Sequence, residues 1–228
     1  MIAPNRIILW HSTPNGAALL PTDAEETAPP FAVVADANPL TDDPRTLAVE
    51  YAAAPRLLTR SGRIDASDPD DAARAAVRTW SRQSWATLSR FCAEIARSGL
   101  RLWLLPASGD VLSDAPRTAA FMAEHPGLEF VLEPSALLTP AMLDHADDHL
   151  DRIARSLGNH PACAALFIAD ASVSAGSLVR CPVGRGSIGP RRLAGFTAAC
   201  RADLPVVLLA DAAEDQLHAL ADRSRTTP

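Results

Sequence analysis

The sequence of 228 residues contains no Lys, because all 21 of its basic residues are Arg. Without an ε-amine, the chain cannot supply the Lys of a phosphate-binding loop, of a Schiff base or pyridoxal phosphate site, or of a Ser–Lys dyad. Abundant Ala together with Arg in place of Lys is typical of GC-rich bacterial genomes. We therefore interpret the absence of Lys first as codon bias.

A basic patch and long apolar runs are also missing. The net charge is −6 and only Arg191 and Arg192 are adjacent basic residues, so we expect no nucleic-acid partner. No run approaches the roughly 18 apolar residues of a membrane span, and the stretch 7–10 ends at His11, too early for a signal peptide. The four Cys have no CxxC spacing and are expected to be reduced thiols. We expect a cytoplasmic protein without a membrane partner.

Short apolar runs rich in branched side chains recur along the chain, with helical patterns between them. With 48% hydrophobic residues the chain can bury a substantial core, and we expect a single domain over residues 1–228. The runs are continuous rather than alternating, which is typical of parallel strands covered on both faces. The seven predicted strands are Arg6–Trp10, Phe31–Ala35, Arg56–Thr59, Leu100–Leu105, Leu128–Leu132, Ala164–Ala169 and Pro205–Ala210.

Helical periodicity is clearest over residues 70–98, where Ser67-Asp68-Pro69 supplies the cap and Gly99 the stop signal. A buried face of this helix is predicted to carry Val77, Trp80, Leu88, Phe91 and Ile95. Further helices are predicted over 115–124, 140–157, 190–201 and 212–222. From Arg56 onward strands and helices alternate, which predicts parallel strands.

The two ends of the chain differ from this pattern. Residues 1–55 contain many Pro and acidic residues and show no convincing helix between the first two strands. We expect irregular N-terminal strands there and a frayed tail over 223–228.

Polar side chains follow the predicted strands, and parallel folds place chemistry at the carboxyl ends of strands. These ends carry His11, Asp36, Arg60, Glu133, Asp170 and Asp211. Glu133, Asp170 and Asp211 could converge on one divalent cation or act as an acid and base pair. The alternative is that polar residues simply begin where buried strands stop, and Asp211 suits a helix N-cap.

Two further motifs allow competing interpretations. Gly184–Gly189 reads GxGxxG and could mark a dinucleotide fingerprint, although Pro190 starts the helix beyond the glycines rather than among them. His145 and His149 lie at i and i+4 and could share a metal, or belong to a solvated, charged helix face.

The chain from about Arg56 to Asp211 carries five motifs in a set order. A long helix and a Gly precede the strand LRLWLLP (100–106), and a helix ends in a His-Pro-Gly turn before VLEPS (131–135). The strand ALFIAD (165–170) follows, and then the loop PVGRGSI (182–188) opens a helix before the closing strand LPVVLL (204–209). In this order the chain resembles the xylose isomerase-like TIM barrels, the superfamily of sugar phosphate isomerases and epimerases that includes endonuclease IV-type enzymes.

The resemblance implies an α/β fold of the (β/α)8 TIM-barrel type. Only seven strands are predicted, and a full barrel usually takes about 250 residues. We therefore expect a barrel that is trimmed or irregular in its N-terminal quarter, or completed by a partner, so that a homo-oligomer stays an alternative.

The resemblance also implies a divalent metal (Mn, Mg, Co or Zn), held by carboxylates and His, that positions a sugar for proton transfer between adjacent carbons. Carried over position by position, most of these ligands are missing. The Asp of one strand becomes Glu133, which could still bind a metal, and the Asp that trails another strand is kept as Asp170. The family's His-x-Gly reads Arg60-Ser61-Gly62, and the other ligand positions carry Leu105, Ala136, Phe167 and Leu209.

Two functions are therefore expected as alternatives. The first is a divergent sugar phosphate isomerase or epimerase with Glu133, Asp170 and Asp211 as catalytic residues. Its sugar or sugar-phosphate ligand would be held by a substrate-binding set of His11, Arg60, Gly184, Arg185 and Gly186, in which the two Arg bind phosphate or carboxylate. The second is an inactive relative whose barrel mouth binds a sugar-like metabolite or a protein. The resemblance implies either a divalent metal or no cofactor.

Overall fold

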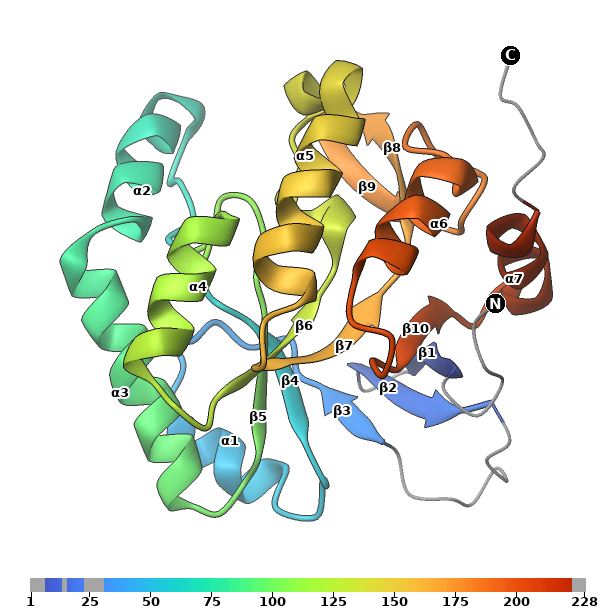
Figure 1. Ribbon diagram of the computed structural model, residues 1–228. Coiled ribbons are helices and arrows are strands. Elements are labelled where there is room, and N and C mark those ends of the chain that lie inside the picture. The colour runs from blue at the N-terminus through green and yellow to red at the C-terminus, as the bar shows by residue number, and fades with distance from the viewer. Residues whose placement is uncertain (1–6, 14–15, 23–30, 223–228) are drawn as a thin grey trace.

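The structure is a computed structural model that describes residues 7–13, 16–22 and 31–222. Eight strands form a closed barrel in the order β1-β10-β7-β6-β5-β4-β3-β2, with helices along its outside (Figure 1). The barrel strands are β1 (Ile7–Thr13), β2 (Gly16–Pro21), β3 (Ala32–Val34), β4 (Leu57–Arg60), β5 (Leu102–Leu105), β6 (Glu129–Leu132), β7 (Cys163–Phe167) and β10 (Val206–Leu209). The α/β barrel and its irregular N-terminal part are confirmed.

All seven predicted runs form barrel strands, and the eighth strand, β2, was not predicted. Only two residues separate β1 from β2, which is too short for a crossover, so the two strands pair as an antiparallel hairpin. β2 is also antiparallel to β3, while every other neighbouring pair in the barrel is parallel. Leu19 of β2 is fully buried inside the barrel. A reversed strand therefore closes the ring, and no partner chain is needed to complete it.

Side chains alternate between the barrel interior and the helical layer. The interior cluster takes one residue in two from each strand, such as Ile8, Leu58, Trp103, Val131 and Val207. The residues between them pack against the helices. Because both faces are buried, the strands read as continuous apolar runs, as the sequence indicated.

The helix predicted over 70–98 is two helices, α2 (Ala72–Thr79) and α3 (Arg82–Arg97). The chain breaks at Ser81, whose hydroxyl accepts a hydrogen bond from the backbone N–H of Ser84 (3.2 Å) and caps α3. The predicted buried face is therefore correct only for α3. Val77 and Trp80 are 68% and 45% exposed, because α2 buries a different face, with Ala75 and Thr79.

The helix α1 (Pro44–Glu50) was not predicted. The others follow the predicted segments: α4 (Ala115–Glu124), α5 (Ala146–Ile153), α6 (Pro190–Ala199) and α7 (Ala213–Ala221). The segment predicted as one helix over 140–157 starts with a 3-10 turn, η4 (Pro140–His145), and ends in a π turn, η5 (Ala154–Gly158). Asp211 is not an N-cap: Ala212 holds that position with φ +59°, and no side chain caps α7.

A second, two-stranded sheet is inserted after β7. β8 (Asp170–Ser174) and β9 (Ser177–Cys181) form a hairpin whose turn residues, Ala175 and Gly176, both have positive φ. The register pairs Asp170 with Cys181 and Ala171 with Arg180. β9 lies against the 3-10 turn η3 (Pro134–Leu137), which follows β6. The hairpin therefore stands at the carboxyl end of the parallel strands, which we call the mouth.

The described cysteines carry free thiols, as expected. Burial raises the pKa of Cys92 and of Cys163 to about 12, so both thiols stay uncharged at neutral pH. No helix in the described part of the chain is long and apolar enough to cross a membrane. The predicted frayed tail, 223–228, lies outside the described residues.

Candidate functional site at the barrel mouth

The alternation along each strand determines which strand-end residues face the barrel interior. Val131 and Leu58 belong to the interior cluster. Glu133 and Arg60 lie two residues further along the same strands and therefore point inward at the mouth. Of the eight predicted site residues, these two are the ones that the structure brings together there.

Glu133 is 2% exposed and is bound by Arg180 from β9. Arg180 Nε donates to Glu133 Oε1 (2.8 Å) and Arg180 Nη2 donates to Oε2 (2.6 Å), which is a bidentate pair. The hydroxyl of Ser135 also donates to Oε1 (3.0 Å). The carboxylate predicted to ligate a metal or act in catalysis is thus engaged on both oxygens.

The guanidinium of Arg180 lies over two aromatic rings inside the mouth. Its carbon atom Cζ is 4.4 Å from the ring centroid of Phe167 and 4.8 Å from that of Trp10. The two rings are themselves stacked, with centroids 4.9 Å apart. Such cation–π contacts add attraction to the ion pair. Arg180 thereby covers the floor of the mouth, with 31% of its side chain still exposed.

Arg60 makes a second bidentate pair at the same end of the barrel. Its Nε and Nη2 donate to Asp110 Oδ2 (2.9 Å) and Oδ1 (2.8 Å). Asp110 is fully buried, and burial raises the pKa of its carboxyl, an effect that Arg60 offsets only in part. Partial burial lowers the pKa of Arg60, but Asp110, Glu133 and Asp36 together raise it above its ordinary value. Arg60 therefore stays charged.

The two guanidinium groups have the same arrangement. Each uses Nε and Nη2 for a buried carboxylate, and neither Nη1 makes a hydrogen bond to the described residues. The Arg60 side chain is 49% exposed and that of Arg180 31%. The mouth thus offers outward guanidinium edges that are oriented from behind by Asp110 and Glu133.

Asp170, by contrast, points away from the mouth. It lies three residues after the interior residue Phe167 and therefore faces the helical layer. Its fully buried carboxylate accepts backbone N–H groups: Ala171 (2.8 Å) and Ile188 (3.0 Å) on Oδ1, Gly184 (3.2 Å) on Oδ2, and Gly189 on both oxygens. Asp170 is thus an internal anchor for the loop 182–189.

The same contacts explain the GxGxxG motif. A Cβ atom on Gly186 would lie 2.4 Å from Asp170 Oδ1 and 2.5 Å from the carbonyl oxygen of Ala171, so only glycine fits. The backbone N–H groups that such a loop would offer to a phosphate are turned onto Asp170 instead. Gly184 also needs glycine because its φ is +87°. Arg185 is exposed on this loop.

The remaining predicted site residues lie elsewhere. His11 follows the interior residue Trp10 on β1, so its half-buried side chain faces the outside of the barrel. Asp211 is exposed after β10, and its backbone carbonyl accepts a hydrogen bond from Gln216. The predicted convergence of Glu133, Asp170 and Asp211 is therefore not observed.

The donor set of the mouth does not fit a divalent metal. No group of three or more His, Cys, Asp or Glu within the described ranges could hold a metal ion. Glu133 is committed to Arg180, and the inward side chains of β5, β7 and β10 at this end are Leu105, Phe167 and Leu209. Apolar side chains cannot ligate a metal. We assign no metal-dependent step to these residues.

Arg180 and Asp110 are two residues of the mouth that were not predicted from the sequence. Arg180 had a local signal, because Ala175-Gly176 between branched residues resembles a two-residue hairpin turn. Nothing local marks Asp110, whose partner Arg60 is 50 residues away.

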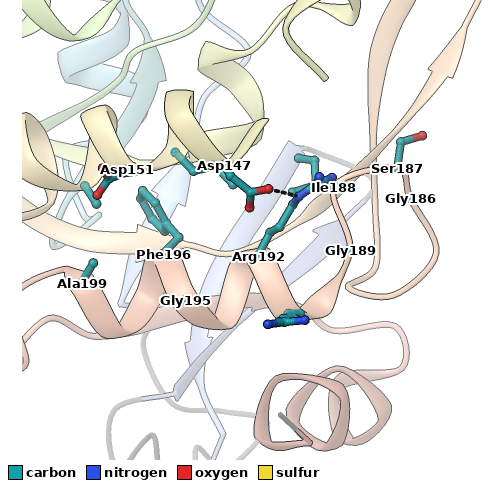
Figure 2. A pocket seen from close by; sticks show the side chains of 13 residues that line it. Asp147, Asp151, Gly186, Ser187, Ile188, Gly189, Arg192, Gly195, Phe196 and Ala199 are labelled. Carbon is teal, nitrogen blue, oxygen red and sulfur yellow. Dashed lines mark hydrogen bonds and ion pairs between the residues drawn. The ribbon is translucent and has the colours of Figure 1, made fainter. Parts of the chain in front are cut away.

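A separate hollow of about 800 Å³ lies outside the barrel, between α5 and α6 (Figure 2). Its walls include Leu150, Asp151, Gly195 and Phe196, and Gly186–Gly189 closes one end. Arg192 Nε and Asp147 Oδ2 form an ion pair beside it (3.1 Å), as Figure 2 shows. No side chain of the mouth lines this hollow.

No family model matches the sequence, and no curated protein matches it. Solved structures are similar in fold. A D-tagatose 3-epimerase-like protein has a TM-score of 0.51 at 12% identity, over 82% of this chain and 72% of that one. A probable 3-DHS dehydratase from Bacillus anthracis has a TM-score of 0.47 at 13% identity, over 83% and 72%. A xylose isomerase domain protein from Planctomyces limnophilus has a TM-score of 0.48 at 13% identity, over 77% and 61%.

The chain thus spans 61% of the length of the Planctomyces limnophilus protein, and the identities are low enough that the likeness concerns the fold alone. Together with the closed eight-stranded barrel, this likeness confirms the TIM-barrel fold that the resemblance implied. In its fold the chain is an α/β TIM barrel, similar to that of the D-tagatose 3-epimerase-like protein.

Proposed function

We propose that the protein binds a small anionic sugar-like ligand, a sugar phosphate or sugar acid, at the barrel mouth without a metal ion. The observation that carries this proposal is the pair of partly exposed arginine side chains, Arg60 and Arg180, each bound through Nε and Nη2 to a buried carboxylate. Planar, pre-oriented guanidinium edges match carboxylate and phosphate oxygens. Half-buried Trp10 beside Arg180 adds apolar surface next to these guanidinium groups.

Binding is favoured over proton transfer by the state of the acidic groups. A general base must reach the proton that it removes. Glu133 and Asp110 are 2% and 0% exposed, and arginines cover both. Of the two functions that the sequence leaves open, the metabolite-binding module therefore has the stronger support.

Isothermal titration with sugar phosphates, sugar acids and matched neutral sugars, in the presence of a chelator, tests the proposal. We expect anionic ligands to bind, neutral ones to bind at least tenfold more weakly, and the chelator to change neither affinity. Arg60→Ala should weaken anion binding tenfold or more. Arg78→Ala is the matched control, because Arg78 is 47% exposed on α2, outside the barrel, and its partner is Asp71 rather than a residue of the mouth.

Two results would contradict the proposal. One is the absence of binding for every anionic sugar up to millimolar concentration. The other is equal affinity in Arg60→Ala and Arg78→Ala.

A further inference from the structure

Glu133 occupies the position where the family resemblance implies a metal ligand, and the group bound to it is a guanidinium. Both carboxylate oxygens of Glu133 receive N–H donors of Arg180, at 2.8 and 2.6 Å. A buried carboxylate needs a compensating positive charge, because an unpaired one is strongly destabilising. Here Arg180 of the same chain supplies that positive charge.

We propose that Arg180, delivered by the β8–β9 hairpin, takes the place of a divalent cation at the barrel mouth and makes the site metal-independent. The proposal concerns the charge beneath the ligand site. It does not depend on which ligand binds above, and so it can fail or succeed separately from the proposed function.

The walls around Arg180 suit a guanidinium and not a hydrated metal ion. The guanidinium of Arg180 lies over the rings of Phe167 and Trp10, with Cζ 4.4 and 4.8 Å from their centroids. A weakly hydrated, planar cation is attracted to aromatic faces. A divalent metal needs oxygen or nitrogen ligands on every side, and these rings provide none.

The hairpin delivers Arg180 at a fixed place. Arg180 pairs with Ala171, the residue after Asp170, and the Asp170 carboxylate is held by four backbone N–H groups, one of which comes from Ala171 itself. Gly186 packs directly on the same two residues. The base of the hairpin is therefore fastened on the helical side of the barrel, while Arg180 extends from its other face into the mouth.

Chemical rescue of Arg180→Ala tests the proposal. The variant should melt at least about 5 °C below the wild type, since it leaves Glu133 buried without its partner. Millimolar guanidinium or methylguanidinium should restore at least half of that loss, whereas Mg²⁺, Mn²⁺ or Zn²⁺ should restore none. Arg155→Ala is the control: Arg155 is 71% exposed in an ion pair with Asp151 and should show neither loss nor rescue.

A second variant keeps the test decisive if Arg180→Ala does not fold. Arg180→Met with Glu133→Gln removes both charges, and this double variant should be more stable than Arg180→Met alone. Rescue of Arg180→Ala by a divalent metal that equals or exceeds rescue by guanidinium would overturn the proposal. So would an unchanged melting temperature in Arg180→Ala, or a double variant no more stable than the single one.

Discussion

The two ends of the barrel are both closed by an arginine lying over two aromatic rings, but they differ in how the charge is satisfied. At the mouth, Arg180 comes from an inserted hairpin and both oxygens of its partner, Glu133, are engaged. At the opposite end, the base, Arg56 precedes β4 and lies 4.7 Å from the ring centroid of Phe31 and 5.2 Å from that of Trp103.

Among the residues that the structure describes, the base has no bidentate pair to match that of the mouth. Glu129 accepts hydrogen bonds from Trp103 Nε1 (2.8 Å) and Arg101 Nη2 (3.1 Å), and its side chain is 36% exposed. Arg56 donates to the carbonyl oxygen of Phe31, and its buried Nε has no partner among the described residues. Burial lowers the pKa of Arg56, and the nearby charge of Arg101 acts in the same direction.

This difference in hydrogen bonding indicates that the arginine at the base serves packing, whereas the arginines at the mouth are arranged for ligand recognition. At the base, the arginine fills space above the aromatic rings at some electrostatic cost. At the mouth, the buried carboxylates of Asp110 and Glu133 hold the guanidinium groups of Arg60 and Arg180 in fixed orientations. Burying a carboxylate to orient an arginine carries a desolvation cost. A ligand-binding role for the two arginines explains why the chain bears that cost at the mouth, which is also where TIM barrels place their sites.

The largest difference between the ends should come from Asp170, because no described residue at the base provides a buried carboxylate that anchors a loop. Asp170→Ala leaves several backbone N–H groups buried without acceptors, and we expect it to lower the free energy of unfolding by on the order of 4 kcal/mol. Urea denaturation measures this loss. Asp211→Ala, at an exposed aspartate, should change stability by under about 0.5 kcal/mol. Equal losses in the two variants would refute the anchor role.

The two glutamates offer the next comparison. Glu133→Ala leaves Arg180 without its partner in the mouth and should cost about 3 kcal/mol of unfolding free energy. Glu129→Ala removes a partly exposed acceptor at the base and should cost less than about 1 kcal/mol. Thermal and urea unfolding of both variants check the ranking. The reverse order would mean that the base, rather than the mouth, holds the barrel together.

Arg56 tests whether the base takes part in binding. Arg56→Met keeps much of the apolar stem and removes a donor that lacks a described partner, so stability should change by about 1 kcal/mol or less. Calorimetric titration should give the same affinity for an anionic sugar as the wild type. A loss of affinity comparable to that of Arg60→Ala would place the ligand at the base.

The smallest expected effect is a pH dependence at the mouth. Burial raises the pKa of Asp110 above 3.8, so the folded protein holds this proton more tightly than the unfolded chain. The contribution of Asp110 to the unfolding free energy is therefore fully present below pH 3.8, and it is lost as the pH rises through the raised pKa. The difference in unfolding free energy between the wild type and Asp110→Asn should therefore decline above pH 3.8 and then level off. A difference that stays constant from acidic to neutral pH would contradict this expectation.

The barrel could be predicted from the sequence because its strands are buried on both faces. β2 escaped detection because Gly16, Ala17 and Ala18 have little strand propensity, and its burial comes from neighbours on both sides.

The site was only partly predictable. Glu133 and Arg60 end their strands in inward register, but Asp170 is one residue out of that register and faces the helices. The partners Asp110 and Arg180 are 50 and 47 residues distant in sequence, and only the folded chain brings them to the mouth.

The barrel closes where its first strand, β1, pairs with its last, β10, and this pairing has a consequence for synthesis of the chain. β1 pairs with β2, which follows it directly in the chain, but its other neighbour is β10, whose first residue is Val206. Until then the outer edge of β1 carries unpaired backbone groups next to Ile7, Ile8 and Leu9. Exposed apolar edges of this kind recruit other strands. A nascent chain halted before residue 206 should therefore aggregate through β1, and release of the last strand from the ribosome is the step that ends this exposure.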